Sequence, residues 1–183
     1  MARFIIQGGK PIGGTFLPRG NKNAVLPMLA SCLLTDQPVV LRNVPLINDV
    51  KVMLELLESI GVAVRLEGHT VTLCAKSIRT TELDQELCAR VRTSILLAGP
   101  LCARHGGATI YPPGGDVIGR RRLDTHFYGL RSLGAEISID QAYRFKAGPL
   151  TPWKMVFDEA SVTATENTLM AATLAAGTST IYN

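Results

Sequence analysis

The stretch Leu57-Glu58-Ser59-Ile60-Gly61-Val62 recurs 73 positions later as Leu130-Arg131-Ser132-Leu133-Gly134-Ala135. Before each copy's glycine, apolar residues follow helical spacing on one face. Glycine is the preferred residue just past the end of a helix, where the backbone turns left-handed. Two short strand-like segments follow each glycine, 63–66 with 70–74 and 136–139 with 143–147. The chain is therefore predicted to be built from a repeated unit.

A second kind of helix also repeats, and it has no polar face. Its three copies cover residues 24–34, 95–103 and 169–176, and each leads into a short strand. A helix that is apolar all round is normally buried. We therefore predict an α/β fold (α+β in some schemes) of βαβαββ units, with three buried helices surrounded by sheets and surface helices. Two units are complete, and the third stops after its first helix and strand.

The composition is that of a globular protein. The chain has 183 residues, of which 46% are hydrophobic and 19% are charged, enough for one domain with a sizeable core. No apolar run is long enough to span a membrane, and the first residues do not resemble a signal peptide. We therefore expect a cytoplasmic protein that does not bind membranes.

The charge and the cysteines narrow the range of ligands. A net charge of +4 suits an anionic small molecule, while 5% aromatic residues are few for stacking on nucleic acid bases. No two cysteines have the CxxC spacing of zinc or redox sites. We expect no metal and no nucleic acid partner, and four reduced cysteines that act as packing residues.

The starts of the buried helices are candidate anion sites. If the helices share a direction, their N-terminal N–H groups and positive partial charges meet on one face. At the first start, Asn21 or Asn23 can cap the helix and Lys22 adds a full charge. Arg92 precedes the second helix, and hydroxyl residues in 161–165 precede the third. Taken singly, each start is explained by a helix cap or a solvated charge without any ligand.

Between the second helix and the next surface helix lies a loop rich in proline and glycine, residues 112–122. These residues exclude a helix or central strand and suit a loop that can close over a site. Asp116 lies in this loop, just before three arginines. It is either a turn residue or a general acid whose pKa rises when the site closes.

Together these motifs resemble the enolpyruvyl transferases that begin peptidoglycan precursor synthesis. The resemblance rests on Gly20–Pro27, on Arg92–Ile95 followed by Gly99-Pro100-Leu101, on Pro113–His126 and on Ser161-Val162. It covers the whole chain in order and implies an inside-out α/β barrel. The sister family that makes enolpyruvylshikimate phosphate shares this fold, but it typically has serine at the position of Asn23.

The resemblance also implies a reaction without metal or cofactor. The enolpyruvyl group of phosphoenolpyruvate passes to the 3-hydroxyl of UDP-N-acetylglucosamine, and phosphate leaves. By position, Asp116 and Lys22 would be catalytic, and Lys22 and Asn23 would bind phosphoenolpyruvate. The residues implied to hold the UDP-sugar are Arg92, Arg121, Asp124, Ser161 and Val162.

Several residues depart from the family pattern. Asp116 stands where most members carry cysteine, so we expect resistance to fosfomycin, an antibiotic that alkylates that cysteine. Glu159 stands where a lysine near the uridine is common. Arg122, Thr125 and Thr163 also differ from the usual residues.

Family members have two domains of three units each, with the active site between them. By this resemblance, residues 1–20 are a strand segment of the second domain, and residues 21–183 form the first domain. We therefore expect the chain alone to be inactive. The alternatives are a non-catalytic module that binds UDP-sugars or other anions, and an RNA-end-processing relative. The incomplete third unit further predicts self-association.

Overall fold

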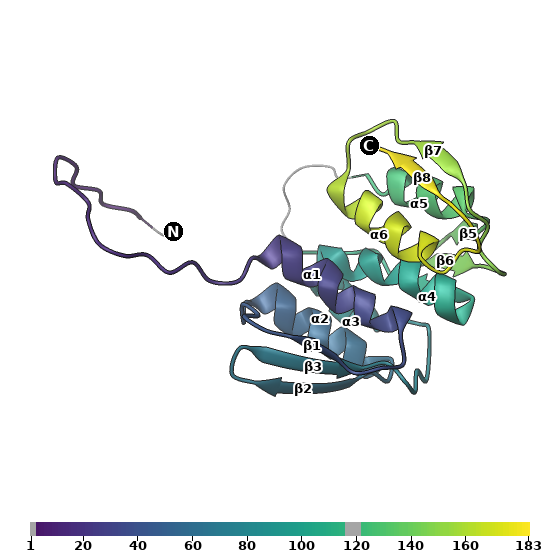
Figure 1. Ribbon diagram of the computed structural model, residues 1–183, viewed down its shortest axis with the longest axis horizontal. Helices are drawn as coiled ribbons and strands as arrows, with labels where there is room; N and C mark the ends of the chain where they lie inside the picture. The colour runs from purple at the N-terminus through teal and green to yellow at the C-terminus, as the bar shows by residue number, and fades with distance from the viewer. Residues whose placement is uncertain (1–2, 116–121) are drawn as a thin grey trace.

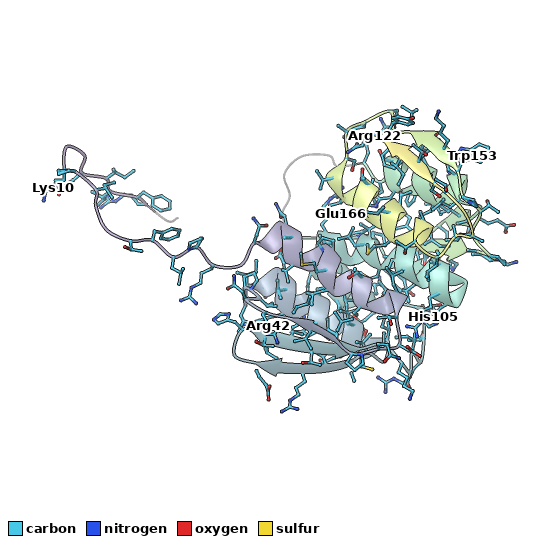
Figure 2. All side chains as sticks on the ribbon, in the orientation of Figure 1. Lys10, Arg42, His105, Arg122, Trp153 and Glu166 are labelled. Carbon is cyan, nitrogen blue, oxygen red and sulfur yellow. The ribbon has the colours of Figure 1, made fainter. Side chains whose placement is uncertain are left out.

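The computed structural model describes residues 3–115 and 122–183 (Figure 1). Its N-terminal segment, residues 3–21, forms no helix or strand and leads away from the folded part. Figure 2 shows Lys10 at its far end. Phe4 is 88% exposed and Ile12 is fully exposed. The strand expected within residues 1–20 is thus not formed in the described part, because no neighbouring strand takes its backbone N–H and C=O groups.

The first unit contains a buried-type helix, a surface helix and a three-stranded sheet. The sheet has the order β1-β3-β2 with antiparallel pairs, and a two-residue turn at Gly68 and His69 joins β2 to β3. Its elements are α1 (Lys22–Ser31), η1 (Cys32–Leu34), β1 (Val39–Leu41), α2 (Asn48–Ser59), β2 (Ala63–Glu67) and β3 (Thr70–Cys74).

The second unit repeats this plan, with the sheet order β4-β6-β5. The apolar helix predicted over 95–103 is divided into a 3-10 segment and an α-helix, and a short helix that the sequence did not predict comes before it. A single parallel bridge between Glu82 and Thr109 takes the place of a first strand. The elements are α3 (Gln85–Arg90), η2 (Arg92–Leu97), α4 (Ala98–His105), β4 (Gly107–Ile110), α5 (Asp124–Ser132), β5 (Glu136–Ile139) and β6 (Tyr143–Lys146).

The third unit has a strand on either side of its helix. β7 (Lys154–Val156), which the sequence did not locate, pairs in parallel with β8 (Thr180–Tyr182), and α6 (Val162–Ala172) connects them. Parallel neighbours need such a crossover, so this pair is the βαβ element from which each predicted unit begins.

The two surface helices end in the same way, which confirms the repeat. Gly61 and Gly134 have φ angles of 109° and 100°, the left-handed region that favours glycine. The N–H of Val62 donates to Leu57 O at 2.9 Å, and the N–H of Ala135 donates to Leu130 O at 3.0 Å. Both bonds satisfy a carbonyl in the last turn of the helix, and Leu130 O accepts a second bond there, from the N–H of Leu133 at 3.2 Å.

The helices predicted to be buried pack together and run in the same general direction (Figure 1). The η2–α4 segment contacts α6 and also the α1–η1 segment, and residues 94–102 are all buried. Burial on all sides is wrong for the other two helices, since Met28 of α1 is 50% exposed and Leu169 of α6 is 56% exposed. The described residues cover α1 on the sides that face η2, α2 and α6, and they cover α6 on the sides that face η2–α4, α5 and α1.

Arg104, in the last turn of α4, joins the first two units. Its Nη1 donates to the carbonyl oxygens of Leu33, Thr35 and Ala75 at 3.1, 2.7 and 2.9 Å. These carbonyls lie at the end of η1 and just after β3, where the first unit leaves backbone acceptors unpaired. One side chain of the second unit therefore completes the hydrogen bonding of the first.

All four cysteines are free, as predicted. Cys32, Cys88 and Cys102 are buried, and burial raises the pKa of the Cys32 and Cys102 thiols to about 12. Neutral thiols in apolar surroundings act as small hydrophobic side chains. None of the described helices has the length and apolar character needed to cross a membrane.

Candidate functional site

The start of α1 presents Lys22 beside a second helix. The Asn21 side chain caps α1 by accepting from the N–H of Ala24 at 3.1 Å, so Asn21 is the cap and Asn23 remains exposed. Lys22 Nζ lies 2.6 Å from Asp49 Oδ2, in the first turn of α2, and both side chains are about half-buried. An anionic ligand at Lys22 would thus share the ammonium group with this carboxylate.

The start of η2 positions Arg92. Val91 has an extended backbone and separates α3 from η2, so Arg92 begins a new helical segment. The loop that follows β4 packs against this junction, with the N–H of Gly114 donating to Cys88 O at 3.0 Å. A Cβ at Gly114 would lie 1.7 Å from Ala89 O, so only glycine lets the loop approach this closely.

The start of α6 carries Ser161 and Val162. The Ser161 hydroxyl accepts from the N–H of Ala164 at 3.3 Å, which confirms the helix-cap interpretation for this residue. The N–H of Ser161 donates to Asn183 Oδ1 at 2.9 Å. Val162 is 69% exposed and is the first residue of the helix. The first turn of α6 thus faces solvent, with the partial positive charge of a helix N-terminus.

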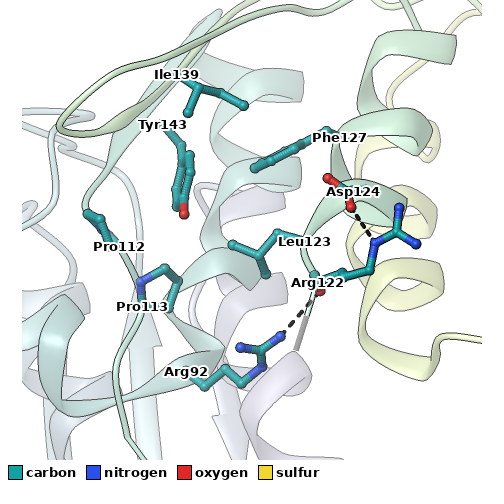
Figure 3. A pocket seen from close by; sticks show the side chains of 9 residues that line it. All are labelled: Arg92, Pro112, Pro113, Arg122, Leu123, Asp124, Phe127, Ile139 and Tyr143. Carbon is teal, nitrogen blue, oxygen red and sulfur yellow. Dashed lines mark hydrogen bonds and ion pairs between the residues drawn. The ribbon is translucent and has the colours of Figure 1, made fainter. Parts of the chain in front are cut away.

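A pocket of about 350 Å³ lies between Arg92 and the start of α5 (Figure 3). Its mouth is charged: Arg92 Nη2 donates to Arg122 O at 3.3 Å, and Arg122 Nε donates to Asp124 Oδ2 at 2.6 Å. The hydrogen bond to Asp124, and then the Asp124 charge, raise the pKa of the Arg122 guanidinium. The other lining residues are Pro112, Pro113, Leu123, Phe127, Ile139 and Tyr143. Apolar walls with a few charged groups at the mouth are typical of small-molecule sites.

A second, smaller pocket of about 200 Å³ lies beside α1 and is lined mainly by apolar residues. Asn21 and Met28 line it, together with residues 41–45. Neither Lys22 nor Asn23 lines it. In the described part of the chain, no group of His, Cys, Asp or Glu side chains is arranged to hold a metal ion.

The structure gathers some of the predicted site residues and separates others. Arg92 and Asp124 line one pocket, whereas Lys22, Asn23, Ser161 and Val162 lie at the starts of α1 and α6 and do not line it. Figure 1 shows these two helix starts on the same side of the molecule. Asp116 and Arg121 lie outside the described residues.

Two residues in contact with the predicted site were missed from the sequence. Asp49 pairs with Lys22, and its position at the start of an amphipathic helix was the available signal. Arg122 was set aside as a departure from the family, yet it links Arg92 to Asp124.

The chain is similar in sequence to known proteins along almost its whole length. The sequence profile of the EPSP synthase (3-phosphoshikimate 1-carboxyvinyltransferase) family matches residues 6–183. Over the whole chain, 49% of residues are identical to the UDP-N-acetylglucosamine 1-carboxyvinyltransferase of Treponema denticola, and 50% to that of Borreliella burgdorferi. In both cases the chain spans 43% of the relative's length.

Solved structures give the same fold at lower identity. The enolpyruvyl transferase NikO from Streptomyces tendae superposes with a TM-score of 0.78 at 21% identity, over 95% of this chain and 41% of that one. EPSP synthase from Acinetobacter baumannii gives a TM-score of 0.71 at 17% identity, over 92% of this chain and 40% of that one. The predicted inside-out α/β barrel fold is confirmed.

Proposed function

Because the chain belongs to the EPSP synthase (3-phosphoshikimate 1-carboxyvinyltransferase) family, we propose that it is part of an enolpyruvyl transferase whose acceptor is UDP-N-acetylglucosamine. One observation carries the choice of acceptor. About half of all residues, along the whole chain, are identical to enzymes named for that acceptor, whereas an EPSP synthase structure shares 17%. Asn23, where the shikimate enzymes typically have serine, supports the same choice.

The proposed chemistry begins with protonation of the phosphoenolpyruvate methylene carbon. The adjacent carbon becomes electrophilic, and the sugar 3-hydroxyl adds to it with loss of its proton. The methyl group of the tetrahedral intermediate then loses a proton as the bond to phosphate breaks. We assign the proton donor to Asp116, a carboxylic acid whose pKa a closed site would raise. Lys22 and Asn23 are assigned to phosphoenolpyruvate, with Lys22 shared between Asp49 and the substrate anion.

The UDP-sugar is assigned to the other helix starts. The first turn of α6, with Ser161 and Val162, offers N–H groups and a positive dipole end to a diphosphate. Arg92 and Asp124 border the pocket beside it. Arg121 suits a diphosphate because a guanidinium donates two parallel hydrogen bonds.

Since the chain spans 43% of the length of these relatives, we propose that it needs further chain for turnover. Residues 1–20 are assigned to a second domain, which would cover the apolar side chains of this segment. Phe16 and Leu17 support this, being 85% and 83% exposed. Turnover of both substrates by the purified 183-residue protein would contradict this assignment.

Calorimetric titration with UDP-N-acetylglucosamine tests the proposal. We expect the native chain to bind the nucleotide sugar, and Arg121→Ala to weaken binding at least tenfold, because loss of a charged hydrogen-bond partner costs about 1.5–3 kcal/mol. A native chain that does not bind the nucleotide sugar would contradict the proposed acceptor. Binding without turnover in a longer protein would favour the alternative, a non-catalytic UDP-sugar or anion-binding module.

Resistance to fosfomycin follows from the same assignment. A carboxylate is a far weaker nucleophile than a thiolate, so Asp116 should not be alkylated where a cysteine would be. Mass spectrometry of the full-length protein after incubation with fosfomycin should show no adduct on the native sequence and an adduct on Asp116→Cys. An adduct at Asp116 itself would contradict the expectation.

We further propose that the protein works in the cytoplasm and self-associates through its third unit. Free cysteines are typical of a reducing compartment. Val156, Leu169 and Tyr182 are 65%, 56% and 48% exposed, enough apolar surface to favour contact with a second copy. Sedimentation that shows a monomer at every concentration would contradict self-association.

A further inference from the structure

A single buried amide lies where the helices of the second and third units meet. Asn167, on α6, is fully buried. Its Oδ1 accepts from the N–H of Gly99 at 2.8 Å, and its Nδ2 donates to Ile95 O at 3.1 Å. The same nitrogen lies 3.2 Å from Nδ1 of His126. A buried amide is costly unless it is hydrogen-bonded, and here both ends of the group have partners.

These contacts determine where His126 carries its proton. The imidazole is buried, with 3% of its surface exposed. Because an amide NH2 group can only donate, Nδ1 of His126 must accept, and the neutral ring carries its hydrogen on Nε2. That nitrogen lies 3.3 Å from Thr163 Oγ1, in the first turn of α6, which can accept the hydrogen. Protonation of Nδ1 would place its N–H opposite the NH2 group of Asn167, so that two hydrogen-bond donors would face each other.

The network joins every described element that carries a proposed UDP-sugar residue. Ile95 belongs to η2, which begins at Arg92; His126 belongs to α5, which begins at Asp124; Asn167 belongs to α6, which begins just after Ser161. A Cβ at Gly99 would lie 2.3 Å from Asn167 O. The close approach of α4 to α6 that lets the amide reach both neighbours therefore depends on glycine at this position.

We propose that Asn167, acting through His126, is a positioning residue that fixes the relative placement of η2, α5 and α6 and so preforms the UDP-sugar site. The inference rests on the function proposed above. Asn167 need not touch the substrate, because its hydrogen bonds connect η2, α5 and α6 inside the protein, behind the residues at the starts of these helices. A binding site is formed in advance when the groups behind it are themselves held in one arrangement.

The test compares the native chain with Asn167→Asp and with Thr168→Val. The first change keeps the shape of the side chain and an acceptor for Gly99, but it removes the donor to Ile95 O and to His126. The second is the matched control: Thr168 is the next residue, is fully buried, and its hydroxyl has no hydrogen-bond partner in the described part of the chain. Valine has nearly the same shape and takes away no bond.

Calorimetry with UDP-N-acetylglucosamine gives the affinity, and ¹⁵N NMR of the His126 ring gives its tautomer and charge. We expect Asn167→Asp to weaken binding about tenfold, within the range seen for residues in coupling networks. It should also convert His126 to the charged form, since a carboxylate accepts from a protonated Nδ1. Thr168→Val should bind like the native chain. At pH 8 loss of packing alone would leave the ring neutral, since exposure to water returns the pKa of His126 only to about 6.5, whereas the carboxylate stabilises the charged ring.

The positioning role is overturned if the Asn167→Asp protein folds, its His126 is charged, and its affinity for the nucleotide sugar is unchanged. It is also overturned if Thr168→Val weakens binding as much as Asn167→Asp does. If Asn167→Asp does not fold, Thr163→Val tests the exposed end of the network, with binding two- to threefold weaker if the proposal holds and unchanged if it fails. A native chain that does not bind the nucleotide sugar overturns the proposed function itself, which separates the two failures.

Discussion

The free energy of unfolding of this protein should decrease at acidic pH because of His126. Burial, and then the positive charge of Arg92, lower the pKa of His126 from 6.5 to about 4. Between these values the unfolded chain binds a proton that the folded chain does not. The stabilisation by the neutral ring is therefore complete above about pH 6.5 and is lost as the pH falls toward 4. The full difference corresponds to about 3 kcal/mol, a large part of the 5–15 kcal/mol typical of a domain.

Urea denaturation of the native chain and of His126→Gln, at several pH values between about 7.5 and 4.5, measures this effect. Other groups, such as Asp140 and Glu166, titrate in both proteins, so their contributions cancel in the difference between the two free energies of unfolding. We expect the advantage of the native chain to shrink by about 2.5 kcal/mol over this range.

A difference that stays constant with pH would refute the reasoning. It would mean that the folded protein accepts the proton on His126 as easily as the unfolded chain does. The Asn167 amide could not then be donating to Nδ1, and the tautomer inferred from the network would be wrong.

Three further changes have expected outcomes. Gly99→Ala places a Cβ 2.3 Å from Asn167 O and should lower the free energy of unfolding by about 1–3 kcal/mol in thermal denaturation; Gly148→Ala, where a Cβ meets nothing within 4 Å, should not. Arg104→Met leaves three carbonyls without their donor and should lower the free energy of unfolding, measured by urea denaturation, by about 2 kcal/mol. If Arg104→Lys is as stable as the native protein, a positive charge alone is sufficient at this position. At pH 8 a thiol reagent should label only the partly exposed Cys74 in the native protein and all four cysteines in urea; rapid labelling of all four without urea would contradict the burial.

The sequence predicted the repeat well because its signals are local. A glycine after an amphipathic helix must take up a left-handed conformation, and Gly61 and Gly134 do so at both copies. Hairpins with alternating residues follow within a few positions, so the strands after each glycine were also found. Secondary structure of this kind depends on near neighbours in the chain.

The extent of burial was less predictable, because it depends on which elements come together in space. The apolar composition of α1 and α6 suggested burial on all sides, yet Met28 and Leu169 face outward. The division of 92–105 into η2 and α4 also escaped prediction, although Gly99 and Pro100 stand directly after the boundary at Ala98. Tertiary context overrides local propensity in such cases.

The site was predicted one helix start at a time, and its connections were not. Spacing drew attention to Lys22 and Arg92, but it could not show that Lys22 is paired with Asp49 or that Arg92 donates to Arg122 O. Asn167, a lone amide on the buried side of an apolar helix, was the one sequence signal for the network, and only the structure shows that it meets His126.

The three hydrogen bonds of Arg104 bear on how such a protein could arise by duplication. If a single unit once existed alone, its carbonyls at Leu33, Thr35 and Ala75 had no guanidinium from a following copy. The present repeats are thus not interchangeable, because the end of the first unit is adapted to hydrogen-bond with the second. Amide hydrogen exchange should accordingly show the first two units opening together rather than one at a time.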